Sequence, residues 1–325
     1  MKNKQIITGS ILCMIASVSW GAMFPVAHIA LQQIDPFYFS FLRYLFVTII
    51  LCGLLWIKEG FSAFRLEGRG KALVFFGTMA FTVYNMGVFL GQHLMGEAGT
   101  IAASIMEVLM PMISILLLSV TTKKLPPSYT WTSIAIALGG ALLVITKGNL
   151  TFFATASEQL FPLLLIFAGV VGWVVYSLGG GHFSDWSTLR YSTLTCLLGT
   201  AVSFVIITIG SLFQWIPVPS WDSMMSVKYE MAFMVLFPGL AALLSWNAGI
   251  KALTPLNGIL FINLVPITTL ILMTFQGYEI SMFECYGTLL VIFALIRNNH
   301  FQRKQLGHRV AAREKGKRSI TSIPY

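Results

Sequence analysis

Residues 6–31 read IITGSILCMIASVSWGAMFPVAHIAL and contain no Asp, Glu, Lys or Arg. This run is longer than the about 20 apolar residues that an α-helix needs to cross a hydrocarbon core of roughly 30 Å. Lys2 and Lys4 precede it, as in a secretory signal peptide, but the run is too long for one and no polar mature domain follows a cleavage site. We therefore expect the run to stay in the membrane as the first transmembrane helix.

The rest of the chain has the same character. Of its 325 residues, 56% are hydrophobic and 10% are charged, against about 45–50% and 25% in soluble domains. The apolar runs are continuous and lack the alternation of membrane strands, which favours helices. The predicted fold is an all-α membrane protein of ten transmembrane helices. These are residues 6–31, 36–57, 71–92, 98–120, 129–146, 160–181, 186–213, 230–251, 256–276 and 279–296.

The distribution of Lys and Arg predicts the orientation of these helices. With ten crossings, 18 of the 21 basic residues lie on the side of both termini, and only Arg43, Lys147 and Lys228 lie on or toward the other side. The positive-inside rule then places both termini in the cytoplasm. The net charge of +9 comes largely from a basic tail, residues 298–325, which suits the anionic cytoplasmic leaflet. We expect the lipid bilayer as a partner and no nucleic acid.

The chain also repeats itself weakly, because three features of the first half recur in the corresponding segments of the second at offsets of 147, 153 and 155 residues. They are Leu-Arg-Tyr at 42–44 and 189–191, Trp20 and Trp173, and Pro111 and Pro266. A unit with an odd number of helices must insert its second copy upside down. We therefore predict two inverted five-helix repeats, residues 6–147 and 160–297, an architecture of transporters with a substrate site near the midplane.

With these features the chain resembles the drug/metabolite transporter superfamily, specifically its ten-helix EamA group. The resemblance covers residues 9–296 and rests on Ser-Trp-Gly at 19–21 with Phe24, on Leu-Arg-Tyr at 42–44, and on the apolar patterns around Pro111 and Pro266. It implies a transporter of the bacterial cytoplasmic membrane. Known members export amino acids, other metabolites or drugs, and relatives in the superfamily carry nucleotide sugars. Efflux of a small molecule is the function that this resemblance implies.

The sequence departs from the family at two positions. Many members have Asn or Glu immediately before the proline of the fourth and ninth helices, whereas this chain has Met110 and Val265. No polar substrate contact is therefore expected at these two positions.

Glu107 is the sharpest candidate for chemistry. It lies about nine residues into the segment 98–120, hence roughly 14 Å deep at 1.5 Å per residue. A carboxylate near the bilayer centre costs on the order of 2.5–3.5 kcal/mol even on the gentlest scales. The side chain should therefore face a cavity or find a partner. It either contacts substrate or exchanges a proton, or it is a neutral acid bonded to a neighbouring helix.

Four prolines inside the apolar segments are candidate hinges. A proline has no N–H, so the carbonyl four residues earlier loses its helical partner, and in lipid it must be satisfied by protein or by cavity water. Kinked helices that gate a cavity are one interpretation, and ordinary membrane prolines are the other. The four are Pro25, Pro111, Pro238 and Pro266.

Aromatic and amide side chains deep in the segments complete the candidate site. Buried indole and phenol groups need hydrogen-bond partners, so we expect a cavity that suits a neutral or zwitterionic ligand. The alternative is interhelical hydrogen bonds, worth about 0.6 kcal/mol each. Arg43 and Arg190, at equivalent ends of the two repeats, are expected to reach the headgroups, and the alternative is that they attract anionic groups to each vestibule. The candidates beside Glu107 are Trp20, Tyr84, Asn85, Trp173, Tyr176, Trp246, Asn247 and Asn263.

Motif spacing narrows the function classes. No phosphate-binding loop is present, so ATP is not expected as a direct energy source. There is no GxSxG, no HExxH and no pair of mid-membrane Asp residues, and the His and Cys residues are not spaced as ligands, so we expect no enzyme, metal or cofactor. The leading hypothesis is a secondary exporter, with or without proton coupling. An intramembrane enzyme and a non-transporting sensor stay open as alternatives.

Overall fold

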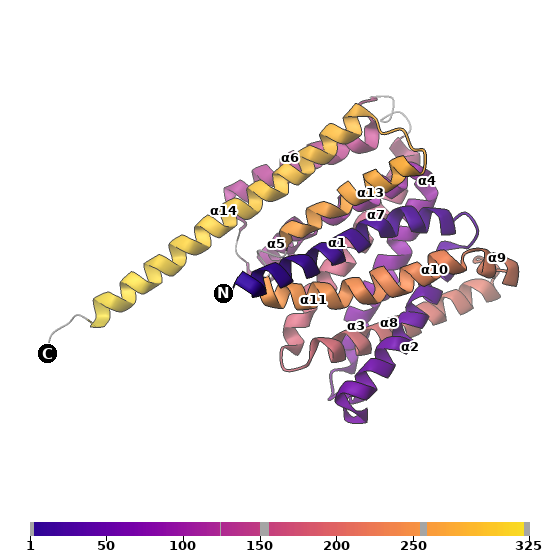
Figure 1. Cartoon of the computed structure of the whole chain (residues 1–325), viewed down its shortest axis with the longest axis horizontal. Coiled ribbons are helices and arrows are strands. Elements are labelled where there is room, and N and C mark those ends of the chain that lie inside the picture. Colours follow the sequence, from indigo (N-terminus) through magenta and orange to yellow (C-terminus); the bar gives the residue numbers. More distant parts are fainter. Residues whose placement is uncertain (1–2, 124, 150–155, 254–258, 322–325) are drawn as a thin grey trace.

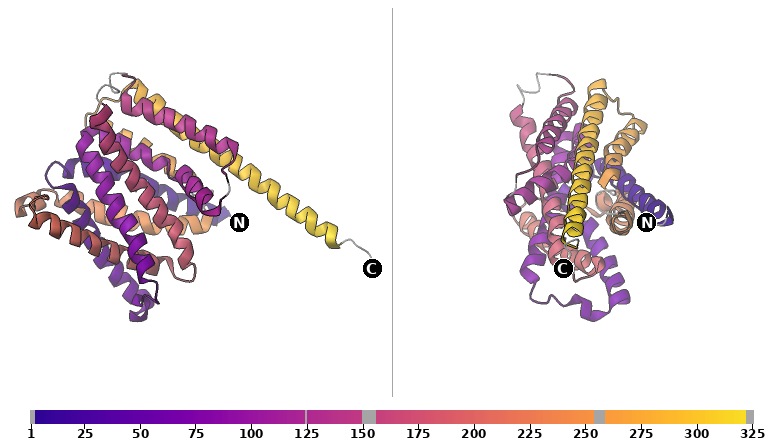
Figure 2. Two further views of the ribbon diagram at one scale, coloured as in Figure 1. Left: turned by 180° about the vertical axis from the view of Figure 1, so that it is seen from behind. Right: turned by 90° about the vertical axis from the view of Figure 1, so that its left-hand side faces the viewer.

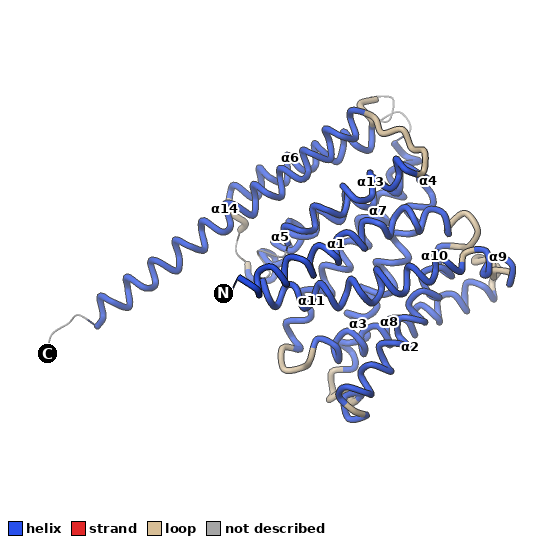
Figure 3. The backbone as a smooth tube through the Cα atoms, in the orientation of Figure 1, coloured by secondary structure: helices blue, strands red, loops and turns tan. Residues whose placement is uncertain are grey.

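The protein is helical throughout the part of the chain that the computed structural model describes, residues 3–123, 125–149, 156–253 and 259–321. No strand occurs in these ranges, as Figure 3 shows by colour. The expectation of an all-α membrane protein is therefore confirmed for the described residues.

The first half of the chain contains α1 (Asn3–Ala30), α2 (Pro36–Glu59), η1 (Phe61–Phe64), α3 (Gly70–Gly77), the π-helical segment η2 (Thr78–Tyr84), α4 (Asn85–Val108), α5 (Met110–Thr122) and α6 (Ser128–Thr146). The second half contains α7 (Ala156–Gly179), η4 (Gly180–Phe183), α8 (Thr188–Leu212), α9 (Trp221–Ser226), α10 (Lys228–Met234), the π-helical segment η5 (Val235–Ala241), α11 (Ala242–Leu253), η6 (Ile259–Asn263), α13 (Leu264–Phe275) and α14 (Met282–Thr321).

Seven helices in the described residues are long and apolar enough to cross a membrane, and two apolar helices are shorter. The seven are Gln5–Ala30, Pro36–Glu59, Gly70–Val108, Ser128–Thr146, Leu160–Phe183, Thr188–Leu212 and Lys228–Gly249, and the shorter two are Met110–Thr122 and Phe261–Phe275. Each predicted segment is mainly helical over its described residues, with ends that differ by a few residues: the segment 186–213 begins as a helix at Thr188 and the segment 279–296 at Met282. The start of the segment 256–276 lies outside the described residues.

Local chemistry explains where several helices begin and end. At the start of α2, the Asp35 carboxylate accepts a hydrogen bond from the Phe37 N–H at 2.8 Å, and Pro36 occupies the first turn, where a missing N–H costs nothing. Gly96 interrupts the helical geometry within α4, with φ 61° and ψ −135°. This break separates the predicted segments 71–92 and 98–120.

The segment 98–120 is not one helix, contrary to the prediction. It consists of the end of α4, a break at Leu109, and α5. Pro111 lies in the first turn of α5, so it begins a helix instead of kinking one. Glu107 consequently lies in the last turn of α4, next to the break.

Helices from the two halves pack against each other throughout the bundle. α1 contacts α11 and α13, α7 contacts α4 and η2, and α2 contacts α8. α6 and α14 pair along one edge of the bundle (Figure 1). α14 continues well beyond the other helices, and Figure 2 shows its C-terminal part projecting away from the bundle. This part contains most of the basic tail.

Candidate functional site

A cavity of about 200 Å³ lies inside the bundle, between helices of both halves. Its lining residues come from α1, α2, α4, α5, α7, α11 and η6 and from both π-helical segments. Seven of the predicted site residues are among them. They are Trp20, Tyr84, Glu107, Pro111, Trp173, Pro238 and Trp246.

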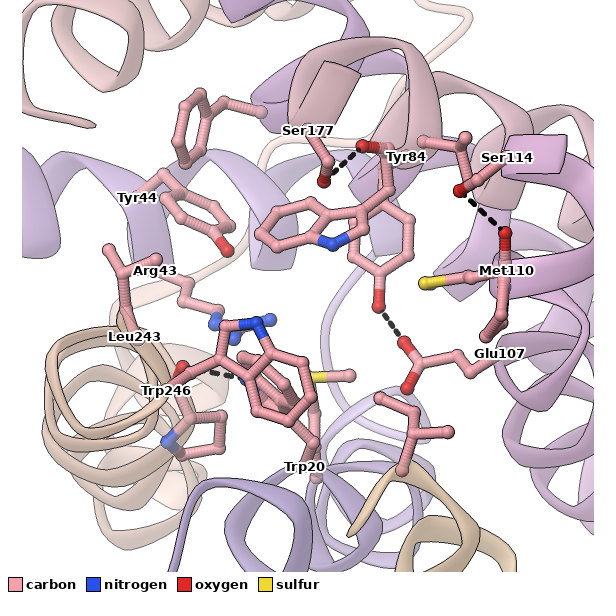
Figure 4. A pocket seen from close by; sticks show the side chains of 18 residues that line it. Trp20, Arg43, Tyr44, Tyr84, Glu107, Met110, Ser114, Ser177, Leu243 and Trp246 are labelled. Carbon is pink, nitrogen blue, oxygen red and sulfur yellow. Dashed lines mark hydrogen bonds between the residues drawn. The ribbon is translucent and has the colours of Figure 1, made fainter. Parts of the chain in front are cut away.

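Glu107 faces this cavity, and its side chain is buried, with 3% of its surface exposed. Its carboxylate accepts a short hydrogen bond from the Tyr84 hydroxyl, which Figure 4 shows as a dashed line. The Tyr84 ring in turn packs against Trp173, with ring centroids 5.0 Å apart. The carboxyl group therefore has a defined partner and a defined direction, and it does not face lipid.

Arg43 does not reach the headgroups, contrary to the expectation. Its side chain is 1% exposed and lines the cavity. Nε donates to the Met234 carbonyl and Nη1 donates to the Asn85 side-chain oxygen, both at 3.3 Å. The guanidinium also lies 4.9 Å from the centroid of the Tyr44 ring. Buried in this way, Arg43 is held by contacts to two other helices, α4 and α10.

The Met234 carbonyl that Arg43 contacts lies directly before the π-helical segment η5. In a π-helix a carbonyl pairs with the N–H five residues later, here that of Gly239, so Pro238 does not leave this oxygen unpaired and Arg43 adds a second donor to it. The sequence contained a signal for the burial of Arg43, because this residue lies seven residues after Pro36, roughly 10 Å into the helix. That depth is too great for the guanidinium to be treated as a helix-end group.

In α1, a carbonyl freed by a proline is satisfied by a side chain of another helix. Pro25 removes the helical partner of the Gly21 carbonyl, and the Thr269 hydroxyl donates to that oxygen at 2.8 Å. Pro25 and Pro238 therefore lie where α1 and η5 are held by side chains of other helices. Pro266 lies in the first turn of α13, where backbone N–H groups have no helical partner.

Tryptophans form the wall of the cavity opposite Tyr84. The rings of Trp20 and Trp246 lie 5.2 Å apart, and Nε1 of Trp20 donates to the Pro238 carbonyl at 3.3 Å. In Figure 4, Trp20 and Trp246 lie together below Arg43, while Glu107 approaches from the other side. The site thus combines large aromatic surfaces with one cationic and one acidic group.

The remaining predicted residues lie outside this lining. Tyr176 and Asn247 line a second hollow of about 400 Å³ between α7, α8 and α11, which shares Trp173 and Trp246 with the central cavity. Asn85 is fully buried behind Arg43 and donates to the Ala80 carbonyl at 2.8 Å. Asn263, Pro25 and Pro266 are buried but absent from the described lining.

An ionic cluster that the sequence did not suggest joins the loop between α2 and α3 to the loop between α7 and α8. Arg69 forms a bidentate pair with Asp185, with both distances 2.8 Å. Arg190 contacts Glu67 at 2.7 Å, and its guanidinium lies 3.9 Å from the centroid of the Trp186 ring. Arg190 therefore pairs with a loop of the first half of the chain.

Charge pairing controls the titration of both carboxylates in this cluster. Hydrogen bonds from Arg190 and then Trp186 lower the pKa of Glu67. The hydrogen bonds from Arg69 lower the pKa of Asp185. Both carboxylates are therefore negatively charged at neutral pH, and their ion pairs hold the two loops together. We call these four charged residues, Glu67, Arg69, Asp185 and Arg190, the loop cluster.

Metal binding has no support in the part of the chain that the structure describes. No group of three or more His, Cys, Asp or Glu side chains there is arranged to hold a metal ion.

A helical bundle with a buried carboxyl group, a buried guanidinium and neighbouring indoles around an internal cavity is typical of membrane transporters. The model of the EamA-like transporter family matches residues 7–146 and again residues 160–299, and the chain belongs to this family. It is an integral multi-pass protein of the bacterial plasma membrane.

Similar proteins carry transporter names without a substrate. The chain is 53% identical to "Uncharacterized transporter YrdR" of Bacillus subtilis, over 99% of this chain and all of that protein. It is 28% identical to "Uncharacterized transporter YyaM" of the same organism, over 86% and 90%. It is 23% identical to "Uncharacterized inner membrane transporter YedA" of Escherichia coli, over 86% of both chains.

A solved crystal structure shares the fold. It aligns with a TM-score of 0.62 at 18% identity and covers 89% of this chain and 96% of the solved one. At this identity the likeness concerns the fold alone.

Proposed function

We propose that this protein is a secondary transporter that exports a small metabolite by alternating access around the central cavity. The observation that carries the proposal is the pair of opposite charges, Arg43 and Glu107, buried in one internal cavity of a transporter-family chain. Buried charges are costly in a membrane and are kept where substrates or ions pass. Among the described lining residues, the hydroxyls of Ser114 and Ser177 donate to backbone carbonyls and not to a base, which favours a transporter over a hydrolase.

The architecture in this proposal is ten crossings in two inverted repeats, with both termini in the cytoplasm. Two observations support it. The family model matches the chain twice, and the π-helical segments η2 and η5 occupy corresponding places, starting at residues 78 and 235. Both segments contribute lining residues to the cavity. π-helical turns often occur at functional sites, which is consistent with a cavity between the repeats.

The substrate class follows from the chemistry of the walls. Arg43 and Glu107 line one cavity of about 200 Å³ and form no ion pair with each other within 4.0 Å, so both groups are available to a ligand in that cavity. A zwitterion such as an amino acid would place its carboxylate at Arg43 and its ammonium group at Glu107. Trp20, Trp173 and Trp246 would enclose the apolar part of such a ligand.

The route of the substrate in this proposal leads through the second hollow. This hollow adjoins the cavity through Trp173 and Trp246, and it extends to Trp186 and Ser187 beside the loop cluster. The positive-inside rule assigns that end of the bundle to the cytoplasm. Pro25 and Pro238 act as hinges, since each removes a backbone N–H donor from the segment in which it lies. Glu107 either contacts the substrate or exchanges a proton during the cycle.

Flux into sealed vesicles tests the proposal. Purified protein in liposomes should accumulate radiolabelled amino acids unchanged, and a metabolite export screen of a deletion and overexpression pair identifies which one. An enzyme would release a chemically altered product, and a sensor would show no flux.

Arg43→Gln tests the role of the buried cation. This variant should lose at least tenfold in flux, whereas Arg65→Gln, the same change at an exposed loop arginine, should keep it. Equal flux from a folded Arg43→Gln variant and from wild type would exclude Arg43 from the substrate site.

A further inference from the structure

A groove on the outer surface of the bundle is separate from the central cavity. It lies between α2 and α10, has a volume of about 510 Å³, and is bordered by the short helix α9. Figure 1 shows α9 beside the end of α10. None of the described residues that line this groove also lines the central cavity. Its contents are therefore independent of the transported molecule.

The walls of the groove are apolar and open toward the membrane. Phe46 of α2 and Leu236 of η5 are 47% and 52% exposed, while Met231 and Val235 between them are buried. Ala232 is exposed and small, which leaves the space between the larger side chains free. Since the surrounding helices lie in a bilayer, hydrocarbon rather than water fills such a groove.

The mouth of the groove is polar. Lys228 is the one charged residue among the described residues that line it, and it forms no ion pair with any described residue. Its Nζ lies 5.0 Å from the centroid of the Tyr229 ring. Trp221, on the same rim, is 69% exposed, as is usual for an indole at headgroup level. The acidic residues Asp222 and Glu230 are close in sequence but do not line the groove.

The dimensions of the groove suit a lipid chain. Lys228 and Leu236 are eight residues apart, which corresponds to about 12 Å along the helix axis. An unpaired ammonium group at the headgroup level therefore lies at the end of an apolar channel that runs into the hydrocarbon region. An amphipathic ligand with an anionic head and a long apolar chain matches both parts.

We propose that this groove binds one anionic phospholipid. Its phosphate contacts Lys228 and Trp221, and one acyl chain lies over Ala232 between α2 and α10. The bound lipid supports the contact of α2 with η5 and α10, the same contact that holds the Arg43 side chain against the Met234 carbonyl.

A bulky side chain placed in the groove tests whether the groove binds the acyl chain of the lipid. Native mass spectrometry of the full chain, titrated with phosphatidylglycerol, should show one tightly retained lipid. Ala232→Trp should reduce its retention at least tenfold. Ala168→Trp, the same change at an exposed alanine of α7, is the control and should leave retention unchanged. Equal retention by the two variants would overturn the site.

Removing the charge tests the headgroup part and does not disturb the core, since Lys228 is exposed. Wild type should prefer phosphatidylglycerol over phosphatidylcholine with the same acyl chains. Lys228→Gln should reduce this preference about fivefold, the effect expected of one basic residue near an anionic surface. A wild type without headgroup preference, or a variant with the full preference, would overturn the proposal.

A photolabelling measurement on the wild-type protein tests the same site without any substitution, so it does not depend on whether a variant folds. Phosphatidylglycerol with a photoactivatable acyl chain, diluted into phosphatidylcholine vesicles that contain the wild-type protein, should label peptides containing residues 46–50 and 231–236. Labelling spread evenly over the exposed faces of α7 and α8 would show bulk lipid only and would refute a specific site.

Discussion

At the scale of single residues, the buried polar groups satisfy one another across helices. Tyr84 donates to Glu107, Arg43 bonds to Asn85 and the Met234 carbonyl, and each contact joins different segments of the chain. An unpaired buried donor or acceptor costs about 1–3 kcal/mol, so these bonds fix the direction of each side chain. The charges of the cavity are therefore pre-oriented toward the space between them.

Glu107→Gln separates the two roles proposed for this carboxyl group. The amide oxygen can still accept from Tyr84, so the fold should survive. If Glu107 carries protons, pH-driven accumulation should fall to the background while downhill flux or exchange continues. Both are measured in liposomes with and without an imposed pH gradient. Glu279→Gln, at an exposed loop carboxylate, is the control. Proton-driven transport at the wild-type rate in a folded Glu107→Gln variant would refute the proton role.

Much of the cavity lining could be predicted from the sequence, because membrane burial makes polar side chains conspicuous. Glu107 and the three deep tryptophans stood out for this reason, and the structure brings all four to one cavity. Arg43 was missed because its depth was judged from the helix end alone. Its contact with the Met234 carbonyl depends on how α2 packs against η5, 191 residues away in sequence, and no local pattern contains that information.

At the scale of secondary-structure elements, helix breaks determine where the site lies. The break at Leu109 places Glu107 at a helix end, and the π-helical segment η2 directs Phe81 and Tyr84 into the cavity. The sequence predicted the interruption near Gly96, which polar residues surround. Pro111 and Pro238 marked two of these places as candidate hinges, but the sequence did not predict the break at Leu109 or the π-helical geometry of η2 and η5. Both π-helical segments pack against helices of the other half, and a local pattern does not contain that packing.

Gly96 allows the sharp change of direction within α4, and its replacement tests this role. Its φ of 61° with ψ of −135° is open to glycine but strained for other residues, by about 1–3 kcal/mol. Gly96→Ala should lower the apparent Tm of the detergent-purified protein by several degrees. Gly53→Ala provides the matched comparison, because Gly53 has ordinary helical geometry and free space around it, so alanine should be neutral or slightly stabilising there. Equal effects at both positions would mean that the break does not depend on glycine.

At the scale of the whole molecule, the loop cluster joins the two halves at one end of the bundle. Arg69 and Glu67 belong to the first half, and Asp185 and Arg190 belong to the second. In alternating access, the two halves move relative to each other, so contacts of this kind break and form during the cycle. The cluster therefore lies where it can stabilise one conformation of the transporter.

The pH dependence of this cluster has a definite sign. The pKa values of Glu67 and Asp185 are lowered in the folded protein, so the pairs stabilise it above the ordinary carboxyl pKa of about 4 and lose this effect as pH falls through the folded values. The Tm difference between wild type and a Glu67→Gln, Asp185→Asn double variant should be constant from about pH 8 to pH 5 and shrink below about pH 4. A difference that changes between pH 6 and pH 8 would assign the effect to other groups.

The orientation of the whole molecule in the membrane determines which end of the cavity faces the cytoplasm, and it can be tested by cysteine labelling. Lys147 follows α6 and Asp222 lies on α9, both at the end of the bundle poor in basic residues, whereas Lys123 follows α5 at the opposite end. In a background without the four native cysteines, a membrane-impermeant maleimide added outside intact cells should label cysteine at 147 or 222. It should leave 123 and 317 unlabelled until the membrane is made permeable. Labelling at 317 from outside would require an odd number of crossings, and with it the two halves could not be inverted five-helix repeats.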